Sequence, residues 1–137
     1  MITTEGFNYL LNAGVKGAMQ LSSWHVFPFE GNYTPTAADV AATFSGLATE
    51  ATAYEGLNRP AVSFGNASGG SMDNSATLVE MIFDADKTIY GAALVSNSAK
   101  GAAGGVLLAV ERFAEPRVIK SGTKLQLLVD LDLIQPT

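Results

Sequence analysis

The chain contains no cysteine and a single histidine, His25. Without cysteine there is no disulfide framework, no thiolate zinc site, no iron–sulfur cluster and no cysteine nucleophile. A single imidazole also excludes any site that needs two histidines. The 137 residues suit one domain, which at this size buries roughly two-thirds of its unfolded surface and needs no covalent staple. We therefore expect a single domain over residues 1–137.

Positive charge is also scarce. The chain has 8 Lys and Arg against 13 Asp and Glu, a net charge of −5 at pH 7. It therefore offers no basic field, and we expect no nucleic-acid partner. No apolar run approaches the roughly 18 residues of a membrane span. The first residues, MITTEGFNYLL, lack the basic and apolar regions of a secretory signal. We expect no membrane partner and no secretory signal.

Charged residues of either sign are few. They make up 15% of the chain, while hydrophobic residues make up 47%; soluble domains average about 25% charged residues. One interpretation is a surface rich in Ser, Thr, Asn and Gly, as in many β proteins. The other is that part of the surface is buried in an oligomer or a larger assembly. The two interpretations are compatible.

The amino-terminal third indicates two short helices and a strand. Residues 3–13 have one apolar face formed by Phe7, Leu10 and Leu11, so we expect a helical arm over residues 1–14 that Thr3 or Thr4 caps and Gly14 ends. The stretch 18–29 has strand propensity, and its Pro28 indicates a sheet edge or the end of the strand. A second helix is expected over 36–48, with Thr36 and Asp39 as a capping pair. The elements expected here are a helix over 3–13, a strand over 18–29 and a helix over 36–48.

The remainder of the chain indicates strands. Two short extended pieces are expected at 52–54 and 61–64, and residues 65–75 (GNASGGSMDNS) indicate a loop. The four strands expected after this loop are 76–84, 88–96, 106–113 and 123–134, the first two forming a hairpin through the turn DADK.

The alternation of residues is clearest in the last predicted strand. Leucines and a valine at odd positions from Leu125 to Leu133 alternate with mostly polar residues. A slip of one residue would bury Asp130 and Asp132, so the register is fixed and these carboxylates are expected on the solvated face. The whole pattern predicts a mainly β fold, a β-sandwich or jelly roll with one or two short N-terminal helices.

The possible chemical motifs fail on inspection. His25 has no neighbouring pattern of nucleophile and carboxylate, so we interpret it as structural. Asp84 and Asp86 resemble the start of a calcium loop, but Ile89 and Val95 stand where a Gly and a Glu are needed. The glycines of 101–105 lack the Gly-Lys-Ser/Thr ending of a phosphate loop. We therefore expect no catalytic, cofactor-binding or metal-binding residues and no cofactor.

Several strands are apolar on both faces. Leu128 stands on the face of Asp130 and Asp132, and Leu107 shares a face with Glu111, opposite Leu108 and Val110. Such strands are covered on both sides, by helices or by another subunit. Together with the low charge, this pattern predicts an assembly contact. The residues predicted to form it are Phe7, Leu10, Leu11 and Leu128.

The order of the motifs resembles that of small virion structural proteins of tailed bacteriophages, of the capsid decoration (cement) type. The motifs that carry the resemblance are a helical arm (4–13), a strand from Trp24 to Phe29, a GNYTP loop (Gly31 to Pro35), a TAAD helix start (Thr36 to Asp39), a TE-x-TAY element (Thr49 to Tyr54), an RPA strand start (Arg59 to Ala61), a strand of Gly and small residues (Tyr90 to Ser96) and an SGTKL step (Ser121 to Leu125).

The resemblance implies a non-enzymatic virion protein that binds the outer surface of an assembled capsid. Its partners would be the major capsid protein and further copies of itself, as a dimer or trimer, and it would stabilise contacts between capsomers. A tail or tail-fibre-associated protein that recognises a receptor is the alternative. A third hypothesis is a small carbohydrate-active enzyme that uses a pair of carboxylates.

Overall fold

The computed structural model describes residues 1–133 of the chain, and its strands are joined in antiparallel pairs. The prediction of a mainly β fold with two short N-terminal helices is confirmed. The assignment to a sandwich or jelly roll stays a prediction. In chain order the elements are α1 (Thr4–Leu11), the π-helix η1 (Asn12–Lys16), β1 (His25–Phe29), α2 (Ala41–Leu47), β2 (Ser71–Asp73), β3 (Val79–Ile82), β4 (Lys87–Val95), β5 (Leu107–Ile119), β6 (Lys124–Leu127) and β7 (Asp130–Asp132).

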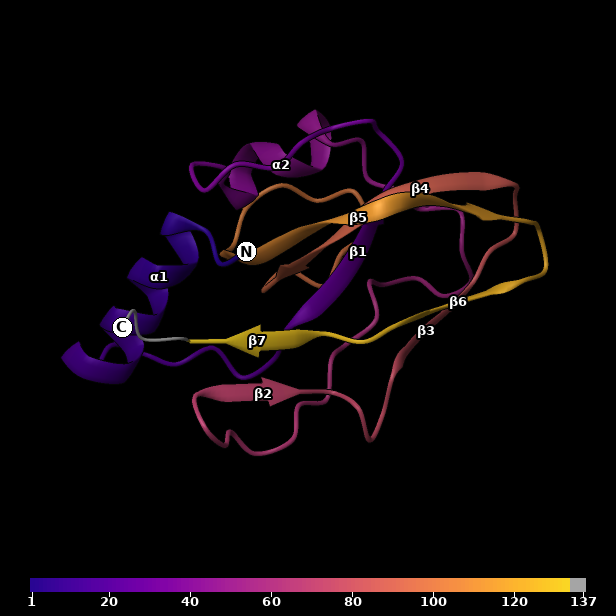
Figure 1. The fold of residues 1–137 in the computed structure, drawn as a ribbon. Helices are drawn as coiled ribbons and strands as arrows, with labels where there is room; N and C mark the ends of the chain where they lie inside the picture. The colour runs from indigo at the N-terminus through magenta and orange to yellow at the C-terminus, as the bar shows by residue number, and fades with distance from the viewer. Residues whose placement is uncertain (134–137) are drawn as a thin grey trace.

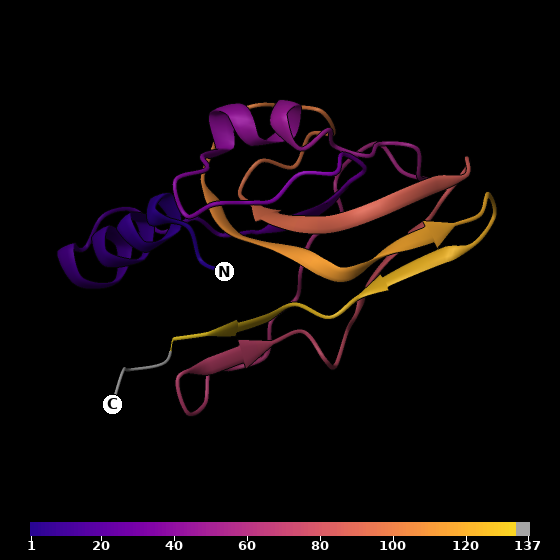
Figure 2. The same cartoon turned by 45° about the horizontal axis from the view of Figure 1, so that its top comes forward.

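The elements form three layers (Figures 1 and 2). A three-stranded sheet with the order β1-β4-β5 is in the middle, and α2 covers one of its faces. Along the other face lies a two-stranded ribbon, in which β3 pairs with β6 and, further along, β2 pairs with β7. Each face has its own apolar core. Phe27, Phe29 and Phe44 belong to the core under α2, whereas Val26 and Ile89 belong to the core that faces the ribbon. Residues of β1 therefore alternate between the two cores, as the sequence predicts.

The edge position of β1 explains how it accommodates a proline. Pro28 pairs with Ala92 of β4, and on the other side β1 makes only isolated bridges to residues 50 and 61. A proline has no N–H to donate to a neighbouring strand, so it fits on an edge strand, where one row of backbone groups has no ladder partner. The strand is shorter than predicted, because residues 18–24 precede it without joining a ladder. The extended pieces predicted at 52–54 and 61–64 likewise make only isolated bridges.

The hairpin predicted from residues 76–96 is wrong. β3 pairs with β6, in the register Val79↔Leu127 and Met81↔Leu125, while β4 pairs with β1 and β5. The turn DADK therefore carries the chain from the ribbon to the middle sheet instead of folding it back on itself. Val79 and Met81 are buried against the middle sheet, so packing between layers determines the path here.

A β-bulge reorients the side chains at the start of β5. Leu94 pairs with Ala109 but Val95 pairs with Leu107, so Leu108 is the extra residue. As a result Leu107 and Val110 face the core under α2, while Leu108 faces the ribbon. The strict alternation predicted for this strand is therefore wrong at the bulge.

The strand β5 is also longer than the predicted 106–113 and continues to Ile119. A second irregularity places four residues, 113–116, opposite the single residue Tyr90. This stretch contains Pro116, which the sequence suggests as part of a link beyond the strand. The bulge accommodates it on the outer strand of the sheet.

The last predicted strand, 123–134, is divided in two. β6 ends at Leu127 and β7 begins at Asp130, while Ile134 lies outside the described residues. The expected alternation holds, since Leu125 and Leu127 are buried and both aspartates are exposed. The β7 partner is β2, which lies inside the predicted loop 65–75.

The helix α2 begins later than predicted. Asp39 Oδ2 accepts the N–H of Thr36 at 2.8 Å, but this bond closes a turn before the helix. The residue at the cap position is Val40, whose side chain makes no capping bond. Instead, the N–H of Ala41 donates to Glu5 Oε2 of α1 at 2.9 Å. A carboxylate distant in sequence replaces the predicted local cap.

Candidate interaction surface

The start of the arm is fixed to the bulge of β5 by hydrogen bonds. Thr3 Oγ1 donates to the carbonyl of Leu107 at 2.5 Å and accepts the N–H of Gly6 at 2.9 Å, so it caps α1 as predicted. The N–H of Thr3 donates to the carbonyl of Leu108 at 3.1 Å. Glu5 Oε2 accepts the N–H of Leu107 at 2.7 Å. These bonds satisfy backbone groups that the bulge leaves unpaired in the ladder.

A glycine allows the close approach of helix and strand. A Cβ added at Gly6 would overlap the carbonyl oxygen of Leu108. Glycine lowers the stability of a helix, but the packing of α1 on β5 requires it at this position. Further along α1, Tyr9 packs edge to face on Trp24 with ring centroids 5.2 Å apart, and Leu10 packs on the core beside it. The arm therefore packs on its own domain through one face.

The opposite face of the arm is apolar and exposed. Phe7, Leu11 and Val15 follow one another at intervals of four residues and are 46%, 60% and 83% exposed. Met19, four residues further, is 91% exposed. We call these four residues the arm stripe. Val15 lies beyond the predicted end at Gly14, because η1 continues the helix until Gly17 adopts a left-handed conformation with φ of 83°. Met19 follows in the segment after the helix.

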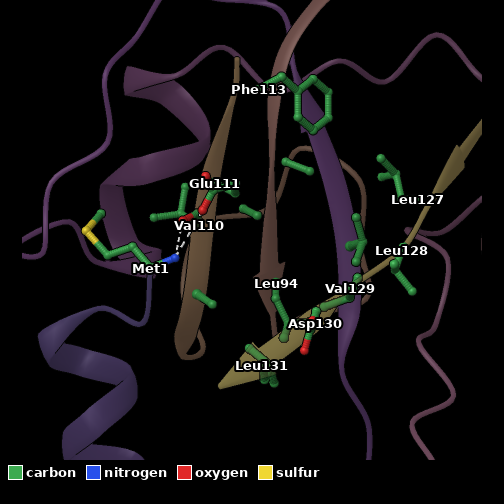
Figure 3. Close-up of a pocket in the computed structure, with 14 residues that line it drawn as sticks. Met1, Leu94, Val110, Glu111, Phe113, Leu127, Leu128, Val129, Asp130 and Leu131 are labelled. Carbon is green, nitrogen blue, oxygen red and sulfur yellow. Dashed lines mark hydrogen bonds and ion pairs between the residues drawn. The ribbon is translucent and has the colours of Figure 1, made fainter. Parts of the chain in front are cut away.

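A second apolar surface lies between the middle sheet and the ribbon (Figure 3). This cavity of about 280 Å³ is lined by Val26, Leu94 and Phe113 of the sheet on one side and by residues 127–131 of the ribbon on the other. We call it the interlayer groove. Leu128 is part of its lining and is 59% exposed. Both walls are apolar because they continue the facing surfaces of the two layers past the end of the core.

Acidic side chains lie beside this groove. Glu111 and Asp130 belong to its lining and both are exposed. The amino group of Met1 lies 3.2 Å from Glu111 Oε2 and donates to the carbonyl of Val110 at 3.1 Å (Figure 3). Asp130 Oδ1 accepts a hydrogen bond from Ser71 at 3.1 Å. The groove thus combines an apolar interior with carboxylates at its margin.

The predicted contact residues divide between these two surfaces. Phe7 and Leu11 lie together on the arm stripe, Leu10 packs on the core of its own domain, and Leu128 lies in the groove. Sequence reasoning missed Val15 and Met19, although the continuing interval of four residues could have indicated them. It could not indicate the groove, which exists only because two layers meet.

The buried ion pair of the chain serves a structural purpose. Arg59 and Glu50 have side chains only 1% and 3% exposed, with Nη2–Oε1 at 2.6 Å and Nε–Oε2 at 3.0 Å. Arg59 also donates to the carbonyls of Asn97 and Ala102, at 3.0 and 2.8 Å. The guanidinium of Arg59 therefore links the glycine-rich loop 97–105 to Glu50, in the segment that follows α2. Each of the three guanidinium nitrogens donates at least one hydrogen bond, which offsets the cost of burying the cation.

Burial shifts the pKa values of two neighbouring groups, the phenol of Tyr54 and the amine of Lys100. The hydroxyl of Tyr54 is buried without a hydrogen-bond partner, and burial raises the pKa of this phenol well above its ordinary value. Lys100 donates to the carbonyl of Tyr54 at 2.5 Å and lies 3.7 Å from the centre of its ring. Burial lowers the pKa of Lys100. These contacts hold the loop against the core.

His25 has a serine hydroxyl on one side of its ring and a backbone carbonyl on the other, with Nε2 lying 3.4 Å from Ser23 Oγ. His25 Nδ1 lies 3.2 Å from the carbonyl oxygen of Arg59. No three His, Cys, Asp or Glu side chains of the described part of the chain are grouped to hold a metal ion. Over the same residues, none of the helices has the length and hydropathy needed to cross a bilayer.

Neither the models of known protein families nor the curated proteins contain a match to this chain.

Proposed function

We propose that this chain is a non-enzymatic capsid decoration protein of a tailed bacteriophage. It binds the outside of the assembled shell, contacts the major capsid protein and holds neighbouring capsomers together. The proposal begins from the resemblance of its motif order to such proteins. It is supported further by the character of the molecular surface.

The observation that carries the proposal is the exposure of large apolar side chains at distant points of a weakly charged molecule. The helix α1, which carries the start of the arm stripe, contacts β5. Val118, which is 68% exposed, lies near the far end of that 13-residue strand. Leu57, in a third segment, is 93% exposed. A protein that connects several neighbours needs more than one contact surface, and exposed apolar groups are typical of such surfaces.

Binding of this kind stabilises a shell by mass action. A ligand that binds the assembled lattice and not the free subunits shifts the equilibrium towards the lattice. The many identical sites of a capsid allow each contact to be modest. The net charge of −5 suits a position outside the shell, because an acidic protein gains nothing from contact with packaged DNA.

The test is the copy number of this polypeptide in purified virions, relative to the major capsid protein. We expect a simple ratio close to one, as occupancy of the shell lattice requires. A few copies per particle would contradict the proposal and favour the tail or tail-fibre alternative. Absence from the particle would overturn both.

A further inference from the structure

We infer that the arm stripe of one copy binds in the interlayer groove of a second copy, so that the chain associates with itself head to tail. The inference goes beyond the proposed function, because it names the surfaces that join two copies in solution without a shell. It combines the two apolar surfaces that the structure leaves without an intramolecular partner.

The stripe cannot fill the groove of its own molecule. Gly6 fits against the carbonyl of Leu108, and the bonds of Thr3 and Glu5 fix the start of α1 to β5. These contacts turn the face of Phe7 and Leu11 outward, where both are exposed. Only the arm of another molecule can present this face to the groove.

The size of the groove suits a few side chains. Its volume is about 280 Å³, whereas a cavity of roughly 150 Å³ holds one benzene molecule. About two large apolar side chains therefore fit, and pockets for drug-sized ligands begin at roughly 300 Å³. Residues four apart on a helix, such as Leu11 and Val15, present side chains of this size on one face.

The charges of the two surfaces are complementary. Residues 6–29 contain no Asp or Glu and include Lys16, although the whole chain has a net charge of −5. The groove has two carboxylates at its margin, Glu111, which already pairs with the amino group of Met1, and Asp130, which has no cation beside it among the described residues. An arm that enters the groove therefore brings a lysine, and no carboxylate, towards acidic groups. Two arms or two grooves facing each other would lack this complementarity.

The total surface area agrees with a missing neighbour. The accessible surface is 7705 Å², whereas a compact monomer of this mass exposes about 6,800 Å². The excess of about 900 Å² is close to the roughly 800 Å² that each partner buries in a standard interface.

Association is measured by sedimentation velocity on the full chain at increasing concentration. We expect the wild type to oligomerise, and Leu11→Asp and Leu128→Asp each to raise the dissociation constant by about 10- to 100-fold, because each removes a large buried apolar side chain. Leu47→Asp is the control, since Leu47, at the end of α2, is exposed outside both surfaces, and it should associate like wild type. A wild type that stays monomeric at several hundred micromolar would overturn the inference.

Mixing the two variants tests the head-to-tail geometry. Leu11→Asp retains an intact groove and Leu128→Asp an intact arm, so an equimolar mixture should form a 1:1 dimer that neither variant forms alone. A mixture that remains monomeric overturns the inference, because arm-to-arm or groove-to-groove contacts would not be restored.

Cross-linking gives an independent measurement if an aspartate variant does not fold. The chain has no cysteine, so Leu11→Cys and Leu128→Cys each introduce a unique thiol. With a short bifunctional maleimide, a mixture of the two should give a mixed dimer in clear excess over either variant alone and over a mixture containing Leu47→Cys. Equal yields would contradict the arm-to-groove contact. The virion copy number is decided separately, so failure of either proposal is recognisable.

Discussion

The two halves of the ribbon are built from the same two stretches of chain, yet only one half is packed. In the β3–β6 half, Val79, Met81, Leu125 and Leu127 are all less than 9% exposed. In the β2–β7 half, described by Ser71–Asp73 and Asp130–Asp132, no residue is buried. Both halves have the same antiparallel pairing. Hydrogen bonding between strands therefore does not decide burial here.

The difference arises from where the core shared by the two layers ends. The core beneath the ribbon includes Leu127 but is only flanked by Val129 and Leu131. Beyond Leu127 the ribbon borders the interlayer groove. The strands β2 and β7 are thus held by their pairing with each other and by the hydrogen bonds of Asn74, which joins the two halves. One end of the ribbon stabilises the fold, while the other remains available for contact with a neighbour.

The largest contrast is expected between two leucines of the same segment. Leu127→Ala removes a buried side chain and should lower the free energy of unfolding by about 2–5 kcal/mol. Leu131→Ala, four residues later in the open half, should lower it by about 1 kcal/mol or less. Urea denaturation of both variants measures the difference. Equal losses would show that the two halves are equally packed.

The joint between the halves depends on one buried amide. Asn74 is 0% exposed, its Oδ1 accepts the N–H of Val129 at 2.7 Å and its Nδ2 donates to the carbonyl of Leu127 at 3.3 Å. The side chain thus completes the pairing where the ribbon is interrupted. Asn74→Ala leaves both backbone groups without a partner and should cost about 1–3 kcal/mol of unfolding free energy.

Hydrogen exchange shows whether that joint couples the halves. In Asn74→Ala we expect faster exchange of the β7 amides and little change in β6. The matched control is Asn66→Ala, in an exposed loop, which should change stability by no more than about 0.5 kcal/mol. Uniform acceleration along both strands would mean that the ribbon opens as one unit.

The smallest effect on stability is expected from Glu80, on the solvated side of β3. A hydrogen bond from Gln126 at 2.8 Å, and Lys124 at 3.2 Å, lower the pKa of Glu80 below its ordinary value of 4.5. Because the folded state has the lower pKa, this stabilisation is complete above 4.5 and is lost as the pH falls through the folded value.

The difference in stability between wild type and Glu80→Gln should therefore shrink as the pH is lowered from 7 to below 4. It should be small at any pH, because the group is solvated. Denaturant unfolding across this pH range measures it. A difference that does not change with pH would exclude the charge of Glu80 as its source.

The sequence predicts the faces of the ribbon better than its partners. Alternation from Leu125 onward correctly separates the buried Leu127 from the exposed Asp130. It gives no sign that β6 pairs with β3, because such pairing is decided by which layer each strand joins. Asn74 lies in a stretch with no periodicity, so its role depends on contacts 53 and 55 residues away.

The candidate surfaces show the same limit. Helical periodicity predicts an apolar face containing Phe7, Leu10 and Leu11, but the structure turns Leu10 inward and the other two outward. The direction of the arm is set by the bulge at Leu108, and no local signal in residues 1–14 encodes it. The position of Leu128 on a polar face was a usable signal, although the groove beside it was not foreseeable.

The attachment of the arm to that bulge has a consequence for synthesis on the ribosome. Glu5 and Leu107, whose N–H donates to the Glu5 carboxylate, are 102 residues apart, and translation at about 5–20 residues per second separates their appearance by roughly 5–20 seconds. A helix of eight residues is not stable alone in water. The first helix of the chain therefore becomes ordered late, once most of the protein has been made.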